Sequence, residues 1–265
     1  MPQDYSLPPR TTSLIDMVFP GDTNHHGVLF GGTGLAHMDK VAFIAAVRHG
    51  HVSFVTASCE RVDFAAPAKL GHLVEATGQV VRVGRTSMSV QVDLVSEDLL
   101  TGARTLCTRG LFNMVAVKPK NPNDAPVVLP PLASEPIEAL QDPSAPVRMV
   151  ELVFPDYTNP QGLMQGGVAL DKMGKAAFVA ASRHCRRIVV MASSRQIDFE
   201  SAVRLGDVIE LIAQVRQVGR TSMTVRVEMW AEGVKEGERR RCAVGEFVMV
   251  AVDSDEKPVR VPPIN

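Results

Sequence analysis

Two segments of the chain have an apolar pattern with a period of three to four residues, and they lie at corresponding places in its two halves. This spacing predicts helices whose apolar side faces a core, and the many alanines allow neighbouring elements to approach closely. The sequence therefore predicts one long, largely buried helix in each half. The apolar positions are Leu35, Met38, Ala42, Ala45 and Ala46 in the first half, and Leu170, Met173, Ala177, Ala180 and Ala181 in the second.

The segments around each predicted helix alternate apolar and polar residues with a period of two, which is typical of strands. A short apolar run ending in Phe-Pro and a loop rich in Asn and Gly precede each helix. Four alternating runs follow it, for example HLVEATGQVVRV and TSMSVQVDLVSE, and we expect them to form an antiparallel meander. One long helix against a curled antiparallel sheet makes an α+β unit.

The chain is an internal repeat. Residues 19–117 align with residues 154–252 without a gap, at a constant offset of 135, and about 44 of the 99 aligned positions are identical. We therefore predict two domains, 12–118 and 147–253, from one duplicated unit. The proline-rich stretch between them, 119–146, is expected to be an extended linker over the surface, and the polar tail after Val252 to be frayed.

Composition narrows the class of protein. With 45% hydrophobic and 22% charged residues the chain is typical of a globular protein, and a net charge of −1 gives no reason to expect nucleic acid as a partner. The longest apolar run is far too short to span a membrane, so we expect no membrane partner and a cytoplasmic location. The four cysteines lack the spacing of a metal site, and we expect no metal.

One acidic residue distinguishes the two copies. Asp39, in the apolar helix of the first copy, aligns with Gly174 in the second. An acid in such a helix is costly unless it is hydrogen-bonded or functional, so this asymmetry predicts one working site in the chain. Alternatively, loop N–H groups or Lys40 could satisfy Asp39. Asp171, one helical turn before Gly174, could support a second, displaced site.

The order of motifs resembles a known family. A strand, a TNxxGxxxGG loop, a helix containing Met-Asp, and strands with VDF and VGRTSM occur twice, over nearly all of the chain outside the linker and tails. In this order they resemble the hotdog-fold acyl-CoA thioesterases of the cytosolic acyl-CoA hydrolase type. The resemblance implies an α+β double hotdog, with two antiparallel β-sheets that are joined edge to edge, each wrapped around a long central helix.

The family resemblance also implies where the active site lies. In that family the helix carboxylate of one unit meets the loop asparagine of the other, which pairs Asp39 with Asn159. The mirror pair, Asn24 with Gly174, lacks its carboxylate. The family pattern also favours a threonine in the strand after the helix, which is Thr56 in the first copy, whereas the second copy has Met191. We therefore expect hydrolysis of fatty acyl-CoA to free fatty acid and CoA at one inter-domain site per chain.

Thioester hydrolysis needs hydrogen-bond donors for the carbonyl oxygen and a base for water. Gly31 and Gly32 precede the helix, and their N–H groups at a helix N-terminus would suit an oxyanion hole, although Gly-Gly there can also be only a tight loop. Asp39 is favoured as general base over nucleophile, but the sequence does not separate the two roles. Asn159 would orient the water or the thioester, or it could serve only in an Asx turn.

Further residues are candidates for substrate binding. Two GRTSM segments could each clamp phosphate through arginine and hydroxyl side chains, or could simply be tight turns that start a strand. Met38, with Phe43 and Met173, is expected to line a tunnel for the acyl chain. The predicted substrate-binding set is therefore Asn24, Arg85, Thr86, Ser87, Arg220, Thr221, Ser222 and Met38.

Two other functions stay open at this point. A hotdog enoyl-CoA hydratase or dehydratase would need a histidine with an acid, and His37 lies near Asp39 but on a different helix face. A non-catalytic acyl-CoA-binding protein would keep the pocket and lose the base. The resemblance further implies that no cofactor is needed beyond the CoA of the substrate, and that the chain forms a homo-oligomer, for which the family offers a trimer of double hotdogs.

Overall fold

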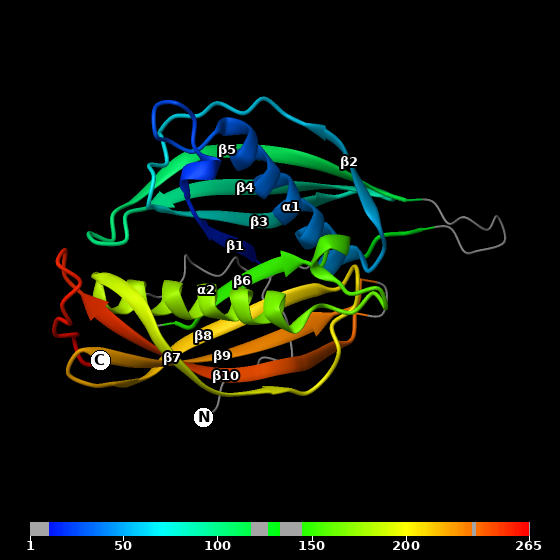
Figure 1. Cartoon of the computed structure of the whole chain (residues 1–265). Coiled ribbons are helices and arrows are strands. Elements are labelled where there is room, and N and C mark those ends of the chain that lie inside the picture. Colours follow the sequence, from blue (N-terminus) through cyan, green and yellow to red (C-terminus); the bar gives the residue numbers. More distant parts are fainter. Residues whose placement is uncertain (1–10, 118–126, 133–144, 235–236, 265) are drawn as a thin grey trace. The chain divides into compact units, whose positions relative to one another are not determined.

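The computed structural model describes residues 11–117, 127–132, 145–234 and 237–264, and the chain divides into two compact units (Figure 1). The first unit contains β1 (Thr12–Met17), a 3-10 turn (Pro20–Asp22), α1 (Gly31–Gly50), β2 (Phe54–Cys59), β3 (Leu73–Val83), β4 (Ser87–Glu97) and β5 (Arg104–Ala116). The second repeats this order with β6 (Val147–Leu152), a 3-10 turn (Pro155–Tyr157), α2 (Gly166–Cys185), β7 (Ile188–Phe199), β8 (Val208–Val218), β9 (Ser222–Glu232) and β10 (Arg239–Val252).

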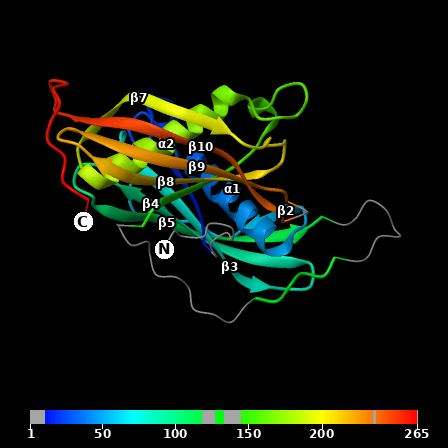
Figure 2. The ribbon, with the colours of Figure 1, turned by 90° about the horizontal axis from the view of Figure 1, so that it is seen from below.

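Each unit has one five-stranded antiparallel sheet, but the strand order is not the simple meander that the sequence predicted. The order is β1-β3-β4-β5-β2 in the first unit and β6-β8-β9-β10-β7 in the second. Only the last three strands of each unit form a meander; β2 pairs with β5 at the far edge. The 13 residues between Cys59 and Leu73 are too long for a hairpin, and they allow this crossing. Figure 2 shows β7, β10, β9 and β8 side by side.

Each helix packs against its own sheet, as the apolar pattern predicted, except that Leu35 and Leu170 are exposed and do not belong to the core. In α1 the side chains of Met38, Val41 and Ile44 are fully buried. The backbone of β3 approaches the helix closely at Gly78, because a Cβ there would lie 2.5 Å from the Val41 side chain. This arrangement of a long helix wrapped by a curled antiparallel sheet is the hotdog fold, and it occurs twice.

Both units contain a buried ionic cluster at equivalent positions. Arg104 donates to the buried carboxylates of Glu75 at 2.8 Å and Glu97 at 2.7 Å. In the second unit Arg239 forms an ion pair at 2.7 Å with Glu210, which is equally buried. Buried carboxylates need such partners because desolvation without compensation is costly. This duplication indicates a structural role.

The predicted linker 119–146 lies mostly outside the described residues, but its described part, 127–132, is not a free connector. Leu129 is buried, and its N–H donates to the carbonyl of Arg85 at 3.1 Å. The tail does the same in the second unit, where Val261 is buried and its N–H donates to the carbonyl of Arg220 at 3.1 Å. The expectation of a frayed tail was therefore wrong at this point. The signal was present in the sequence as PVVLPP and PVRVPP.

Candidate active site

The carboxylate of Asp39 and the hydroxyl of Thr56 meet in the first unit. Thr56 Oγ1 donates to Asp39 Oδ1 at 2.6 Å, and it also lies 3.7 Å from the sulfur of Met114. Asp39 sits on the half-exposed side of α1, in line with Leu35 and Phe43 at intervals of four residues. The Asp39 carboxylate is therefore not buried in the core. It is also not stabilised only by Lys40 or by loop N–H groups. One of its oxygens is held by Thr56, and the carboxylate lies among partly exposed apolar side chains.

A β-bulge explains how β2 directs Thr56 to the helix. The pairing of β2 with β5 shifts between Thr56 and Ser58, so Ala57 is the extra residue. In a regular strand, side chains two residues apart point to the same face of the sheet. The bulge breaks this rule: Thr56 lies opposite the inward-facing Met114, whereas Ser58 lies opposite the outward-facing Asn113. Thr56 therefore points towards the helix and Ser58 points away from it. Bulges often re-aim side chains next to functional sites.

The equivalent place in the second unit has neither the acid nor the hydroxyl. Gly174 is buried in α2, and Met191 of β7 takes the position of Thr56. A Cβ at Gly174 would lie 2.9 Å from the terminal methyl group of Met191, so this methyl group occupies the space next to the glycine. Asp171, one turn earlier, is exposed.

The loop asparagines are held by identical turns in the two units. Asn159 Oδ1 accepts the N–H groups of Gln161 at 3.0 Å and Leu163 at 3.1 Å. Asn24 Oδ1 accepts those of His26 at 2.9 Å and Val28 at 3.5 Å. The Asx-turn interpretation therefore holds for the carbonyl oxygen. Among the described residues the Nδ2 group of Asn159 has no partner, so it is the end of the amide that can bind a substrate.

Gly31 and Asn24 line a cavity of about 360 Å³ at the N-terminus of α1, together with Phe64 and Leu94. The first N–H groups of a helix lack intrahelical partners, so they are donors at this cavity. A Cβ at Gly32 would lie 2.6 Å from the ring of the exposed Phe30, so a larger residue there would displace this ring. The sequence reasoning missed Phe64, whose VDF motif was noted only as part of the family pattern.

The two GRTSM segments form tight turns between strands. Gly84 donates to the carbonyl of Ser87 at 2.7 Å, and Gly219 donates to that of Ser222 at 2.8 Å. The turn interpretation therefore holds for the backbone, while the side chains of Arg85, Thr86 and Arg220 are exposed and Thr221 is half-exposed. Leu129, which bonds to the Arg85 carbonyl, also lies beside Gly50 at the C-terminal end of α1. Gly50 lies about 16 Å beyond Asp39 along the helix axis, at 1.5 Å per residue, so the backbone of Arg85 lies towards the far end of the helix from Gly31.

Other predicted residues are in the core. Met38 is fully buried, with its terminal methyl group near Gly110 of β5, so it belongs to the helix–sheet core and not to an open tunnel. Met173 is fully buried too. Phe43 is half-exposed and stays available to line an acyl-binding surface.

The surroundings of all four cysteines favour the thiol over the thiolate. Burial raises the pKa of Cys107, Cys185 and Cys242. The pKa of Cys59 at the end of β2 is also raised, first by partial burial and then by the charges of Asp39 and Glu60.

In the described part of the chain no group of three or more His, Cys, Asp or Glu side chains could hold a metal ion. No helix in the described ranges is long and apolar enough to cross a membrane.

The fold and these motifs define a tandem hotdog protein, and comparison with known proteins agrees. Residues 26–103 and 161–238 both match the thioesterase superfamily. The chain therefore belongs to this family, with one family domain in each unit.

Similar proteins have related names. The crystal structure of an acyl-CoA hydrolase from Agrobacterium tumefaciens is 52% identical, with a TM-score of 0.84, over 95% of this chain and 97% of that one. The cytosolic acyl coenzyme A thioester hydrolase of Rattus norvegicus is 26% identical over 92% of this chain and 74% of its own length. An uncharacterized acyl-CoA thioester hydrolase of Zymomonas mobilis is 36% identical over 50% of this chain and 86% of its own.

Proposed function

We propose that this chain is an acyl-CoA thioesterase that hydrolyses fatty acyl-CoA to a free fatty acid and CoA, at one site per chain containing Asp39. The observation that carries the site assignment is the 2.6 Å hydrogen bond from Thr56 to Asp39, at a position where the second unit has Met191 and Gly174. The family and its acyl-CoA hydrolase relatives support the reaction. They do not favour the hydratase or the binding-only alternative.

In the proposed reaction Asp39 acts as general base. Thr56 holds Oδ1, so Oδ2 can accept a proton from a water molecule. The water oxygen bonds to the thioester carbon, the C–S bond breaks, and the proton passes to the thiolate of CoA. Because Thr56 fixes Oδ1, the carboxylate keeps one orientation.

The developing oxyanion needs donors, and the N–H groups of Gly31 and Gly32 at the start of α1 would supply them. Asn159 would contribute through Nδ2, because its Oδ1 is used within its own turn. A donor of this kind stabilises a tetrahedral intermediate more than the neutral thioester, which is the requirement for lowering the barrier.

The strands β2 and β7 each lie at one edge of their own sheet and expose apolar side chains, including Val55 on β2 and Val190 on β7. Exposed apolar edges are usually covered in native assemblies. We propose that these edges are covered in the native assembly, and that Asn159 acts with Asp39, as the family resemblance implies.

The remaining properties follow the family. We propose that the enzyme is cytoplasmic, as the rat relative's name says of that protein, that it uses no cofactor other than the CoA of its substrate, and that it is a homo-oligomer of double hotdogs, such as a trimer. Arg85, Thr86 and Ser87, with Arg220, Thr221 and Ser222, would contact the nucleotide end of acyl-CoA. Light scattering of the purified protein tests the oligomer.

The activity is tested with the purified chain, a series of acyl-CoA chain lengths and a thiol reagent. We expect thiol release with saturated acyl-CoA. Loss of enoyl absorbance without thiol release would instead indicate a hydratase, and tight binding without turnover a binding protein.

A single turnover in ¹⁸O-labelled water separates the roles of Asp39: label in the fatty acid alone fits a general base, whereas label in the Asp39 carboxylate shows covalent attack.

A further inference from the structure

The outer face of the first sheet, opposite α1, carries a continuous polar row across four strands. Arg82 of β3 pairs with Ser89 of β4, Ser89 pairs with Asn113 of β5, and Asn113 pairs with Ser58 of β2. Two bulges create it, because the register shifts after Val80 in β3 and after Thr56 in β2. At about 4.8 Å between strands, the row is about 14 Å long.

Hydrogen bonds connect the middle of this polar row. Ser89 Oγ donates to Asn113 Oδ1 at 2.9 Å, and Asn113 Nδ2 donates to Ser58 Oγ at 3.0 Å. The hydroxyl proton of Ser58 therefore points away from the asparagine and can donate to another group. The direction of the chain of bonds is fixed by Asn113, which can donate and accept at once.

The polar row borders a cavity of about 290 Å³ that has charged groups at its ends. Arg82 and Glu60 line this cavity, with Ser87, Ser89 and Asn113 between them. Within the described ranges, neither the Arg82 guanidinium nor the Glu60 carboxylate has an ion-pair partner. A guanidinium presents a planar fork of donors that matches phosphate, and a carboxylate accepts hydrogen bonds from hydroxyl groups.

The second unit has the same backbone at this place but no such site. Gln217, Thr224, Val248 and Ser193 take the positions of the row, in the same register. At the positions of Glu60 and Leu111 it has Arg195 and Glu246, which form an ion pair at 3.0 Å.

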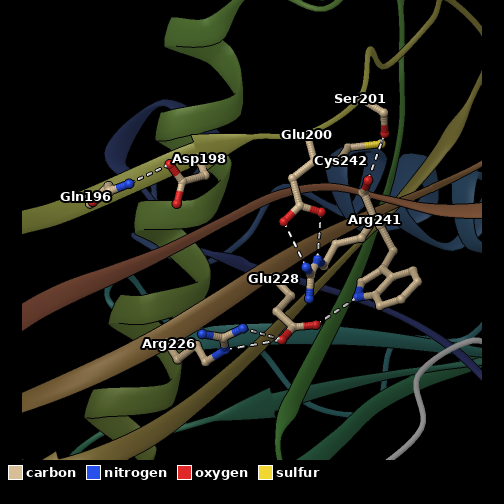
Figure 3. Close-up of polar contacts among 9 residues, drawn as sticks. Gln196, Asp198, Glu200, Ser201, Arg226, Glu228, Arg241 and Cys242 are labelled. Atoms are coloured by element: carbon tan, nitrogen blue, oxygen red, sulfur yellow. Dashed lines mark hydrogen bonds and ion pairs between the residues drawn. The ribbon is translucent and has the colours of Figure 1, made fainter.

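Other charges near this face of the second unit also neutralise one another. Figure 3 shows Arg241 paired with Glu200, at 2.8 Å for both bonds, and Arg226 paired with Glu228. The guanidinium of Arg241 lowers the pKa of Glu200. Arg82 and Glu60 therefore have no unpaired charged counterparts at the equivalent positions of the second unit, which are Gln217 and Arg195.

We propose that this cavity binds a ribose phosphate, the group shared by free nucleotides and the nucleotide end of CoA. The phosphate would bind Arg82, and the ribose hydroxyls would reach Glu60 and the serine hydroxyls. The site is built from the first unit alone and does not involve Asp39. Its failure would therefore leave the proposed thioesterase activity untouched.

The test is calorimetric titration of the purified chain with AMP, ribose 5-phosphate and adenosine. We expect AMP and ribose 5-phosphate to bind once per chain, and adenosine at least tenfold more weakly than AMP. Arg82→Gln, which installs the residue of the second unit, should weaken AMP at least tenfold, and Asn113→Val several-fold. Arg216→Gln removes an exposed arginine from the neighbouring position in the second unit and should change the Kd of AMP less than twofold.

Steady-state kinetics of the same variants identify the source of the ribose phosphate. If Arg82→Gln also raises the KM for acyl-CoA about tenfold with little change in kcat, the cavity holds the nucleotide end of the substrate. If the KM is unchanged, the ligand is a free nucleotide. Arg82 is exposed, so we expect an unchanged melting temperature for Arg82→Gln, whereas Asn113→Val should lower it because the buried Ser89 hydroxyl loses its acceptor. No binding of AMP at millimolar concentration, equal binding by Arg82→Gln, or adenosine binding as tightly as AMP would overturn the proposal.

Discussion

The helices α1 and α2 have the same length, start at the same Gly-Gly pair and pack on sheets of the same order, yet they differ at the position that matters for chemistry. In the first unit Asp39 is hydrogen-bonded to Thr56. In the second, glycine and methionine replace both residues, and the Met191 methyl group lies where a side chain at 174 would begin. The acid and its hydrogen-bond donor are thus replaced as a pair, and the space is filled, which is the result expected when one of two equivalent sites is no longer needed.

The features that both units share are structural, in contrast to the acid and the hydroxyl that only the first unit has. The Asx turns of Asn24 and Asn159, the bulge after the helix, and the buried arginine–glutamate clusters occur twice, and each satisfies backbone or buried polar groups. Comparing the two copies therefore separates structural requirements from candidates for function.

The largest effect is expected for Asp39→Asn. The amide keeps the size of the side chain and can still accept from Thr56, but it cannot take a proton from water. We expect kcat/KM for acyl-CoA to fall about 1,000-fold, or about 4 kcal/mol in the barrier. Asp171→Asn is the matched control and should retain activity within about twofold. Near-normal activity in Asp39→Asn with none in Asp171→Asn would transfer the site to the second helix.

The shared ionic clusters should affect stability. Arg104→Ala removes an ion-pair partner from the buried carboxylates of both Glu75 and Glu97, and the expected loss is about 3–5 kcal/mol in the free energy of unfolding. Arg239→Ala should cost less, because Glu210 keeps its two hydrogen bonds from Arg148. Arg61→Ala breaks an exposed ion pair with Asp63 and should cost about 0–1 kcal/mol. Urea denaturation followed by circular dichroism measures all three, and equal midpoints for Arg61→Ala and Arg104→Ala would refute the structural role.

Thr56→Val tests whether the hydroxyl matters beyond packing, since valine has nearly the same shape. Hydrogen bonds to charged groups are worth about 1.5–3 kcal/mol, so we expect kcat to fall about 10- to 100-fold. Thr56→Ser keeps the donor and should remain within a few-fold of the wild type. In the second unit Met191→Thr alone should change the rate less than about twofold. A fully active Thr56→Val enzyme would show that the 2.6 Å bond is not needed.

The sequence was sufficient to predict the duplication, the two helices and the strands, because each has a strong local period. It did not predict that β2 lies at the far edge beside β5, since strand order depends on a crossing segment and not on the pattern of the strand itself. Asp39 and Thr56 were both identified as site residues. Their direct hydrogen bond depends on the bulge at Ala57, and no residue type at that position predicts a bulge. Met38 was misplaced because an apolar helix residue can face either the core or a substrate, and periodicity alone does not say which.

The smallest effect is expected from restoring the pair in the second unit. Gly174→Asp alone supplies a carboxylate, but the Met191 methyl group, 2.9 Å from the new Cβ, must rotate away and offers no hydrogen bond. The double variant Gly174→Asp/Met191→Thr removes this contact and supplies the donor. Because Asn24 already has the turn of Asn159, the double variant should at most about double the rate of the wild type, while either single change adds nothing. The same pair introduced into Asp39→Asn gives the clearer readout, because any recovered thiol release then comes from the second helix. A folded double variant that stays as inactive as Asp39→Asn would mean that the second unit lacks more than its acid and hydroxyl.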